Sequence, residues 1–598
     1  MPGFFDDPRM LAPARSLRSE RPDGSVVLRS PMPLEPYERC VGEWLERWAR
    51  ETPTALALAE RVATGAWRRL GWGELRAAVG RLAQGLLDLD LPAGKPVAIL
   101  SDNGIDHALL MLAAMHIGRP VCSVSSAYAR LTKDFGKLRG ILQTLDPALV
   151  YAADGQVYGP AVLAAGLSAV TVLGQAAEAV PGALRFDDLL AAQEGPAVMQ
   201  AFRRIAADDP AKYLLTSGST GHPKVVVNTH RMLCANQQMI AQVWRFLDRE
   251  KPVVLDWLPW SHTFGGNHNL NLVLRNGGSL YVDEGRPAPG LIEKTVQNLR
   301  EVRPNLLFNV PRGLDMLLPF LEGDEALAGE ILAPLRLVFY AAAALPAVTW
   351  QRLEAIAGRV RSEPLWLTTA WGSTETSPTV TSAHWRLDRA GCIGIPLPGL
   401  ELKLVPNGEK KELRVRGVSV FPGYRDAPAL TAAAFDDEGY YRIGDAGFLV
   451  DEACPEKGVV FDGRVAEDFK LTSGTWVSVG SLRLGLVSAF APWALDVVIA
   501  GHDRHEVCAL VFPSAACAPA GAQTAAARIA AALRGLRAQG AGSSQCPVRA
   551  LVLTEPPSVE AGEITDKGYI NQRAVLNRRA AEVELLYREP WHPRVIRA

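Results

Sequence analysis

The stretch TSGSTGHPK, residues 216–224, follows a short apolar run and gathers small and hydroxyl-bearing side chains in one loop. Backbone N–H groups can approach a phosphate closely only where side chains are small, and Gly218 and Gly221 provide that room. The side-chain donors of the loop are Thr216, Ser217, Ser219, Thr220 and Lys224. Parallel sheets bind their ligands at the ends of strands, so the stretch predicts a phosphate-binding loop in an α/β fold.

The loop does not match the common nucleotide-triphosphatase pattern GxxxxGK[ST]. Lys224 follows Pro223, where that pattern has glycine, and Val225 follows the lysine. A surface turn rich in turn-forming residues is the alternative interpretation of the loop taken alone. The flanking sequence therefore has to decide between the two.

Short apolar runs alternate with helical stretches on both sides of the loop. The predicted strands are residues 96–100, 119–125, 212–216, 252–259, 279–283, 304–310 and 335–342. The predicted helices include residues 41–50, 107–118 and 524–540. Strands that are apolar throughout and alternate with helices predict stacked, mainly parallel sheets with helices on both faces.

The chain of 598 residues is too long for one hydrophobic core, so more than one domain is expected. Residues 1–36 look irregular, and residues 37–463 are predicted to form the large N-terminal domain. Residues 401–405 and 411–417 alternate in polarity around Asn407 and Gly408, which predicts an antiparallel hairpin within a small barrel. Residues 464–598 are predicted to form a smaller α+β domain.

The overall charge and composition exclude several classes of partner. The formal net charge is −1 with 48% hydrophobic and 21% charged residues, so no nucleic-acid or membrane-surface partner is expected. The N-terminus lacks the apolar region of a signal peptide, and the apolar residues 485–501 contain Pro492 and Asp496, so no membrane span is predicted. Eight scattered cysteines indicate free thiols in the cytoplasm. The sequence is silent on oligomeric state.

Six further segments accompany the loop. They are LPWSHTFGGN (258–267), LVFYAAAAL (337–345), AWGSTET (370–376), YYRIGDAG (440–447), GRVAEDFK (463–470) and GEITDKGYINQR (562–573). In this order they resemble the motifs of the adenylate-forming superfamily, which includes acyl-CoA synthetases, adenylation domains of peptide synthetases and luciferases. The resemblance runs from about residue 37 to the end. Within the superfamily, residues 230–238, 467–477 and 562–573 most resemble feruloyl-CoA synthetases.

The resemblance implies an AMP-forming acid–CoA ligase that uses ATP, Mg²⁺ and CoA. A carboxylate attacks the α-phosphate of ATP, pyrophosphate leaves, and the CoA thiol then displaces AMP from the acyl adenylate. Such a site must bring two anions together, so electrostatic stabilisation and positioning dominate and no protein nucleophile is needed. The implied acid is ferulate or a related hydroxycinnamate.

Three residues are implied to act on the phosphates. Glu375 is the candidate Mg²⁺ ligand, because Mg²⁺ prefers carboxylate oxygens together with substrate phosphates. Thr374 is implied to offer a hydroxyl group to the α-phosphate, and Lys567 to bridge the attacking carboxylate and that phosphate. The alternatives are a helix-capping Glu375 and a solvated Lys567.

Two segments are implied to hold the adenine base. Trp371, where the family more often has tyrosine, offers a flat face, followed by Gly372 and Ser373. Ala342 and Ala343 would lie along the other side of the base, in place of the more usual Ser-Gly-Gly. A buried core tryptophan is the alternative for Trp371.

The ribose and the acid have their own candidates. Asp445 is implied to accept two ribose hydroxyls, with Arg464 reaching the ribose or phosphate through its forked, permanently charged guanidinium. His262 and Phe264 are implied to shape the acid pocket. The alternatives are a surface-turn aspartate at Asp445 and a core histidine at His262.

The family rotates its C-terminal domain about a hinge between the two half-reactions. Here the hinge position is Ala466, where aspartate or lysine is usual. Lys470 matches a lysine that faces the active site during thioester formation, and an exposed strand lysine is the alternative.

Other functions remain open from the sequence. The same enzyme class acting on a fatty or other aryl acid is one, and transfer of the acyl group to a carrier-protein thiol is another. A nucleotide-binding protein without catalysis is a third, although it has no use for a carboxylate-bridging lysine.

Overall fold

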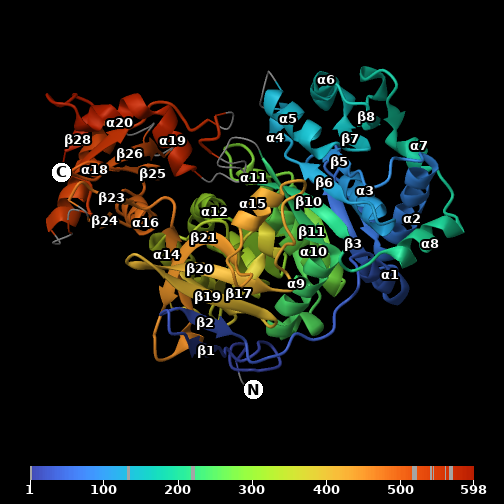
Figure 1. Ribbon diagram of the computed structural model, residues 1–598, viewed down its shortest axis with the longest axis horizontal. Helices are drawn as coiled ribbons and strands as arrows, with labels where there is room; N and C mark the ends of the chain where they lie inside the picture. The colour runs from blue at the N-terminus through green and yellow to red at the C-terminus, as the bar shows by residue number, and fades with distance from the viewer. Residues whose placement is uncertain are drawn as a thin grey trace.

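The computed structural model describes residues 3–130, 135–216, 223–388, 390–473, 475–514, 517, 521–538, 542, 544–558, 561–564 and 570–597. Two large sheets with helices form the body of the molecule, and the C-terminal segment, red in Figure 1, forms a smaller unit beside it. This arrangement confirms the predicted fold class of a large α/β domain followed by a smaller C-terminal domain.

One large sheet has the strand order β11-β10-β6-β5-β7-β8-β9. Its strands are β5 (Val97–Leu100), β6 (Val121–Val124), β7 (Leu149–Asp154), β8 (Val170–Gln175), β9 (Leu184–Arg185), β10 (Pro210–Thr216) and β11 (Lys224–Thr229). Neighbouring strands are parallel, apart from the antiparallel pair β10 and β11. Val97 and Ile99 of β5 face one core cluster and Ala98 and Leu100 face another. Burial on both faces explains the unbroken apolar sequence of this strand.

The second large sheet contains a parallel block with the order β16-β15-β14-β12-β13-β3 and the antiparallel edge strand β4. Its strands are β3 (Leu56–Arg61), β4 (Trp67–Gly71), β12 (Val253–Asp256), β13 (Ser279–Val282), β14 (Leu306–Asn309), β15 (Leu337–Tyr340) and β16 (Trp366–Gly372). Leu306 and Phe308 of β14 belong to the same core cluster as Val97, whereas Leu307 belongs to an outer cluster. The two sheets therefore share one central hydrophobic layer.

Helices fill that central layer and cover the outer faces. Those whose buried residues join the shared core include α2 (Trp72–Asp88), α3 (Ile105–His116), α9 (His230–Val243) and α10 (Leu270–Asn276). Those of the outer clusters include α5 (Gly136–Leu145), α6 (Gly155–Ala165), α11 (Ile292–Val302), α12 (Pro311–Gly323), α13 (Glu325–Leu332) and α14 (Ala347–Val360). Shorter or peripheral helices are α1 (Gly42–Glu51), α4 (Ala127–Arg130), α7 (Phe186–Leu190), α8 (Pro196–Arg204) and α15 (Pro428–Ala433).

An antiparallel layer continues from β16. Its strands are β17 (Thr379–Ser382), β18 (Cys392–Pro396), β19 (Leu400–Asn407), β20 (Lys410–Gly417), β21 (Tyr441–Leu449) and β22 (Val459–Arg464). The layer curls so that β18 also contacts β19 and the N-terminal strand β2 (Val26–Arg29). The predicted hairpin is confirmed, but Asn407 pairs with Lys410, so its two-residue turn is Gly408–Glu409, one residue later than expected. Gly408 has φ +63°, a conformation that favours glycine in such turns.

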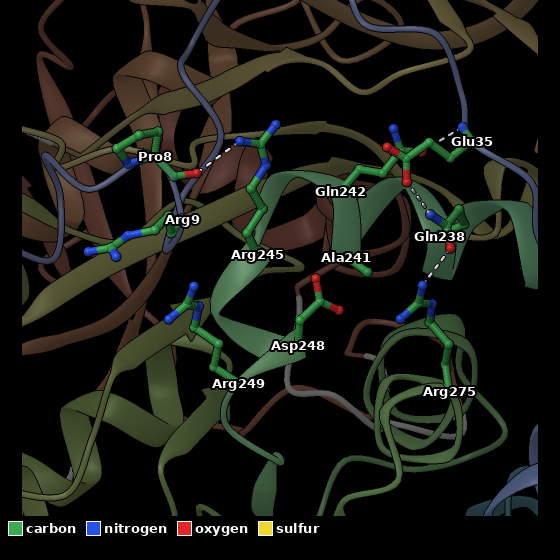
Figure 2. A pocket seen from close by; sticks show the side chains of 10 residues that line it. All are labelled: Pro8, Arg9, Glu35, Gln238, Ala241, Gln242, Arg245, Asp248, Arg249 and Arg275. Carbon is green, nitrogen blue, oxygen red and sulfur yellow. Dashed lines mark hydrogen bonds between the residues drawn. The ribbon is translucent and has the colours of Figure 1, made fainter.

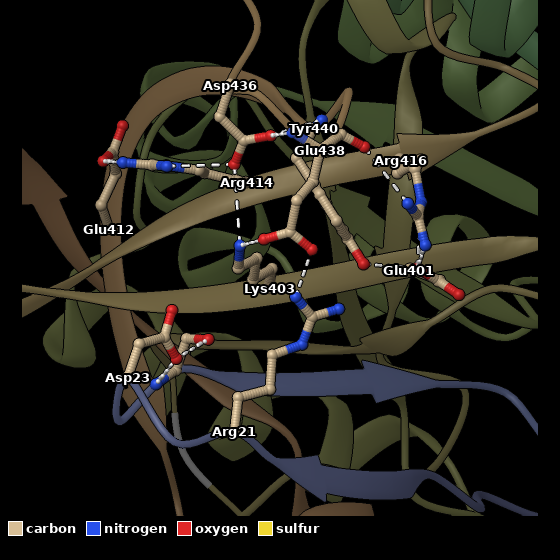
Figure 3. A network of polar contacts seen from close by, with 11 residues as sticks. Arg21, Asp23, Glu401, Lys403, Glu412, Arg414, Arg416, Asp436, Glu438 and Tyr440 are labelled. Atoms are coloured by element: carbon tan, nitrogen blue, oxygen red, sulfur yellow. Dashed lines mark hydrogen bonds and ion pairs between the residues drawn. The ribbon is translucent and has the colours of Figure 1, made fainter.

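The prediction of an irregular N-terminal segment is wrong for part of residues 1–36. Strands β1 (Leu17–Glu20) and β2 form a hairpin, and β2 pairs with β19. Figure 3 shows the polar network that fixes it, in which Arg21 pairs with Glu438, and Glu438 also pairs with the buried Lys403 of β19. These strands are short and one of them is largely polar, so the sequence pattern alone did not reveal them.

The C-terminal unit contains a four-stranded sheet and a small hairpin among its described residues. The sheet comprises β25 (Ala494–Ala500), β26 (Cys508–Pro513), β27 (Arg549–Val552) and β28 (Val595–Arg597), and the hairpin comprises β23 (Phe469–Lys470) and β24 (Trp476–Val477). The helices are α16 (Val479–Ala489), α18 (Ala522–Ala538), α19 (Gln572–Arg578) and α20 (Ala580–Tyr587). Two core clusters, one on each face of the sheet, give it an α+β core separate from the body.

Two expectations about the chain as a whole can be compared with the structure. No helix in the described ranges is long and apolar enough to cross a membrane, and the apolar residues 485–501 divide between α16 and β25. All eight cysteines lie in the described part of the chain, and no disulfide bond joins any two of them.

Candidate active site

The predicted phosphate loop connects the antiparallel strands β10 and β11, and Thr216 pairs with Lys224 at its base. Ser217, Gly218, Ser219, Thr220 and Gly221 lie outside the described residues, so their predicted contacts stay predictions. The ammonium group of Lys224 lies 4.9 Å from the centre of the Tyr424 ring. This contact places the base of the loop beside Tyr424, which in turn bonds to Glu375.

Glu375 is a buried carboxylate linked through Tyr424 to Lys224, at the base of the loop. It lies in the short helical turn Thr374–Thr376 after β16 and is 7% exposed. The hydroxyl group of Tyr424 donates a 3.1 Å hydrogen bond to Oε1 of Glu375, and the backbone N–H of Phe421 donates to the Glu375 carbonyl. Burial and the neighbouring carboxylate raise the pKa of Tyr424, so Tyr424 remains a hydrogen-bond donor. Lys224, Tyr424 and Glu375 thus form one chain of contacts.

Asp445 is held between Trp371 and Arg464. The register of β21 and β22 places Asp445 opposite Arg464, whose Nε lies 2.9 Å from Oδ1. The indole N–H of Trp371 donates a 2.8 Å hydrogen bond to Oδ2. Burial raises the pKa of Asp445, whereas Arg464 and Trp371 lower it and the charge of Glu375 raises it further. The two predicted carboxylates therefore lie within electrostatic range of each other.

The segments predicted to hold adenine leave the same edge of the sheet. Strands β15 and β16 are parallel neighbours, so the residues that follow them emerge side by side. Ala342 and Ala343 are exposed, and Ala342 has φ +71°, a conformation that glycine adopts more easily. A Cβ on Gly372 would lie 1.8 Å from the carbonyl oxygen of Pro378, so only glycine fits this approach. Trp371 itself is buried in the central core, as the alternative interpretation held.

Asparagine side chains hold the backbone that follows β16 at this edge of the sheet. Asn228 on β11 donates to the carbonyl of Thr374 (3.1 Å) and accepts a bond from Asn267 (2.8 Å). Asn236 on α9 exchanges two hydrogen bonds with the backbone of Thr379. Sequence reasoning missed these residues and Tyr424, because their partners are distant in the chain. The available signal was Asn228, an amide that directly follows the apolar run at residues 225–227.

An aromatic cluster lies where the acid pocket was predicted. Phe264 begins the π-helical turn η3 (Phe264–Asn269), and its ring centre lies 5.6 Å from that of Phe339 on β15. His268 stacks on Phe339 at 4.8 Å. Burial lowers the pKa of His268 to about 4, so the ring is neutral near pH 7. His262 is half-buried, and its backbone bonds to Pro259 and Gly266 hold the segment before the turn.

A buried lysine supports the same segment. Lys212 on β10 is 3% exposed, and its ammonium group donates to the carbonyl of Gly266 at 3.1 Å. Burial lowers its pKa to about 7. An amine buried in this way without a carboxylate is costly when charged, so Lys212 is an unusual component of the core.

The remaining predicted residues lie at the junction with the C-terminal unit. Ala466 is exposed in the turn between β22 and β23. The ammonium group of Lys470 lies 5.0 Å from the centre of the Trp476 ring, so the structure places it on the β23–β24 hairpin rather than beside Glu375 or Asp445. Lys567 lies outside the described residues.

The carboxylate of Glu375 suits Mg²⁺ only in combination with a bound nucleotide. No group of three or more His, Cys, Asp or Glu side chains converges within the described ranges. Glu375 offers a single buried carboxylate beside the phosphate loop, and Mg²⁺ commonly combines one or two protein carboxylates with substrate phosphates and water. Glu375 would therefore hold the ion together with the nucleotide.

Figure 2 shows a different pocket, with a volume of about 610 Å³, between the N-terminal segment and α9. Arg9, Arg245, Arg249 and Arg275 line it together with Glu35 and Asp248. None of the predicted site residues that the structure describes lines this pocket, so it is separate from the candidate active site.

Comparison with known families agrees with this geometry. The model of the AMP-binding enzyme family matches residues 45–425, more than half of the chain. The model of the AMP-binding enzyme C-terminal domain matches residues 485–590.

Similar proteins are named as CoA ligases. 4-Coumarate–CoA ligase 2 from Oryza sativa subsp. japonica is 28% identical over 73% of this chain and 75% of its own length. Long-chain-fatty-acid–CoA ligase FadD15 from Mycobacterium bovis is 26% identical over 66% of this chain and 69% of its own length. Probable CoA ligase CCL8 from Humulus lupulus is 27% identical over 51% of this chain. The match covers only 49% of the length of that relative.

Solved structures share the fold along nearly the whole chain. ATP-bound MatB from Rhodopseudomonas palustris has a TM-score of 0.70 at 24% identity, covering 90% of this chain and 99% of its own. The A domain of carboxylic acid reductase from Segniliparus rugosus has a TM-score of 0.72 at 19% identity, covering 92% and 94%. With both domain models matched in order, the chain belongs to the AMP-binding, adenylate-forming enzyme family.

Proposed function

We propose that the protein is an AMP-forming acid–CoA ligase that activates ferulate or a related hydroxycinnamate. The observation that carries the proposal is the convergence of Glu375 and Asp445 at one sheet edge, beside the base of the loop at Lys224. A buried carboxylate beside a phosphate loop suits a metal–phosphate complex, and a carboxylate set by two donors suits a ribose.

In the first half-reaction the acid carboxylate attacks the α-phosphate of ATP and pyrophosphate leaves. Lys224 and the hydroxyl groups of the loop bind the phosphates, and Thr374 lies next to Glu375 to contact the α-phosphate. Bound Mg²⁺ would neutralise phosphate charge. Lys567 bridges the two reacting anions and offsets their repulsion. Asp445, fixed by Trp371 and Arg464, orients the ribose so that the phosphate meets the acid.

The nature of the acid is inferred from the aromatic cluster. Phe264, His268 and Phe339 form a buried, neutral aromatic layer of the kind against which an aryl ring packs. A relative named for 4-coumarate supports the same class of acid. Because another relative is named for long-chain fatty acids, the acid has to be tested directly.

In the second half-reaction CoA displaces AMP from the acyl adenylate. We propose that residues 464–598 form the lid domain, that this domain turns about Ala466 relative to residues 37–463, and that Lys470 then enters the site. The same proposal places the protein in the cytoplasm, where ATP and CoA are available.

Pyrophosphate release, measured against a panel of acids with and without CoA, tests the proposal. The expected result is release with hydroxycinnamates and a CoA thioester detected by mass. A thioester with fatty acids alone would replace the proposed acid. Pyrophosphate release that yields only acyl-AMP would favour transfer to a carrier protein. No pyrophosphate release with any acid would overturn the proposed activity.

A further inference from the structure

Lys410 links the two parts of the chain across the hinge. It is the first residue of β20 in the body of the molecule, and its ammonium group forms an ion pair with Asp468 beyond the hinge. The same ammonium donates to the Asp462 carbonyl at 2.7 Å and to the Ser478 hydroxyl at 2.9 Å. Lys410 thus bonds groups on both sides of Ala466 at once.

Hydroxyl groups extend the connection from the C-terminal side. Ser478 and Ser481 donate to Oδ1 of Asp462, at 3.2 and 3.1 Å. The backbone N–H of Val479 donates to Oδ1 of Asp468 at 2.9 Å, so the start of α16 is tied to the residue that Lys410 holds. We call Lys410, Asp462, Asp468, Ser478 and Ser481 the hinge cluster.

Close backbone packing surrounds the hinge cluster. A Cβ on Gly480 would lie 2.7 Å from Cα of Gly463, so the two segments touch with no room for a side chain. The side chain of Asp468 is only 4% exposed, and burial raises its pKa while Lys410 lowers it. An unpaired carboxylate in such a place is costly, so this orientation of the C-terminal unit depends on the lysine.

The packing is nevertheless open on one side. A cavity of about 840 Å³ borders the hinge cluster and is lined by Lys410, Asp462, Asp468, Trp476 and Ser478 among others. Water can therefore reach the ion pair if the two parts separate, and the charges would then be solvated rather than left buried. These are the properties of a contact that can open and close.

We propose that Lys410 is a positioning residue that holds the C-terminal unit in this orientation, and that opening its pair with Asp468 is a step in domain alternation. The inference rests on the proposed function for its catalytic consequence, but the orientation itself can be measured without substrate. Lys410 touches no residue of the nucleotide site in the described ranges. It acts through Asp468 and α16.

The test compares five variants of the full chain. Lys410→Met removes the ammonium group and keeps the stem, Asp468→Asn keeps the shape of its partner, and the double variant combines them. Lys410→Arg is the conservative rescue. Lys411→Met is the matched control, because Lys411 is the next residue of the same hairpin and pairs with Glu452 within the body.

Native-state trypsin cleavage after Arg464 and Lys470 reports hinge opening. In both single variants we expect its rate to rise at least about five-fold, a typical lower bound for coupling between sites. The double variant should add nothing to Lys410→Met, because that change already removes the pair with Asp468 together with the bonds to Asp462 and Ser478. Lys410→Arg and Lys411→Met should remain near wild type. Unchanged cleavage in Lys410→Met and Asp468→Asn, or an equal rise in Lys411→Met, would overturn the proposal.

Activity supplies a second, separate measurement. The ratio of adenylate formation to thioester formation from pre-made adenylate should change at least about five-fold in Lys410→Met, with Lys410→Arg restoring it. A ratio that stays constant while both rates fall would show a merely structural role and overturn the positioning role. If the wild type activates no acid, the proposed function fails, yet the cleavage rates still decide whether Lys410 holds the hinge. Asp468→Asn decides the question if Lys410→Met does not fold.

Discussion

Trp371 donates its indole N–H to Oδ2 of Asp445 at 2.8 Å, 74 residues along the chain. The sequence resemblance implied that the indole ring binds adenine and that the carboxylate binds ribose. The hydrogen bond joins these two expected roles, because the edge of the ring sets the orientation of the carboxylate. If Asp445 binds ribose as proposed, we expect the identity of residue 371 to affect ribose binding through this hydrogen bond.

Trp371→Phe should weaken ATP binding while keeping an aromatic face for adenine. Loss of one donor to a buried carboxylate costs about 1.5–3 kcal/mol, so we expect the KM for ATP to rise roughly 10-fold or more. The KM for the acid should change little. Steady-state kinetics with each substrate varied in turn would check this, and an unchanged KM for ATP would show that the hydrogen bond has no part in ribose binding.

Glu375→Gln should remove the carboxylate that is proposed to bind Mg²⁺. We expect adenylate formation to fall by about 100-fold or more and the Mg²⁺ concentration for half-maximal rate to rise. Tyr424→Phe is the matched control, because it removes only the hydroxyl that donates to Glu375 and should cost about 10-fold or less. Equal Mg²⁺ dependence in wild type and Glu375→Gln would exclude Glu375 as the metal ligand.

Lys567→Ala should separate the two half-reactions. We expect acyl-adenylate formation to fall by about 100-fold or more, because the ammonium group proposed to bridge the two anions is lost. The variant should still pass a pre-made adenylate to CoA at a rate near wild type. Single-turnover measurements of each step provide the readout. Equal loss in both steps would refute this division of labour.

Lys212→Met should change how stability depends on pH. The folded-state pKa of Lys212 is about 7 against 10.5 for the free side chain, so between these values the unfolded state binds the extra proton. Wild-type stability therefore rises with pH across this window, and below about pH 7 the contribution to the slope vanishes. Relative to Lys212→Met, the free energy of unfolding of the wild type should increase by on the order of 3 kcal/mol from pH 7 to 9.5.

Urea unfolding of both proteins at several pH values checks this expectation. The difference between the two proteins cancels the other titrating groups, provided that they are unaffected by the substitution. Parallel pH profiles would show that Lys212 keeps an ordinary pKa in the folded protein.

The strands of the large sheets that could be predicted, such as β5, β6, β14 and β15, are short, mainly apolar and buried on both faces. The run at residues 96–100 is an example, and Val97–Leu100 is the strand observed. The order of Asp445 and Arg464 in the motifs also implied that they act together, and the strand register places them opposite each other. Local sequence patterns were sufficient to predict a strand where the strand is an apolar run buried in the core.

Contacts between distant segments could not be predicted in the same way. Tyr424 reaches Glu375 and Lys410 reaches Asp468 only because the antiparallel layer folds back on the body and on the C-terminal unit. A tyrosine or lysine in a polar segment carries no sign of such a partner. The N-terminal hairpin was missed for a related reason, since β1 is held by backbone pairing and ion pairs rather than by an apolar face.

That hairpin also has a practical consequence for handling the protein. Strand β2 covers the outer backbone edge of β19, where Leu402 and Leu404 are fully buried. A shortened chain that began at residue 37 would present this edge to other molecules as an unpaired template for intermolecular β-aggregation. We therefore expect a chain without this hairpin to be less soluble than the full chain.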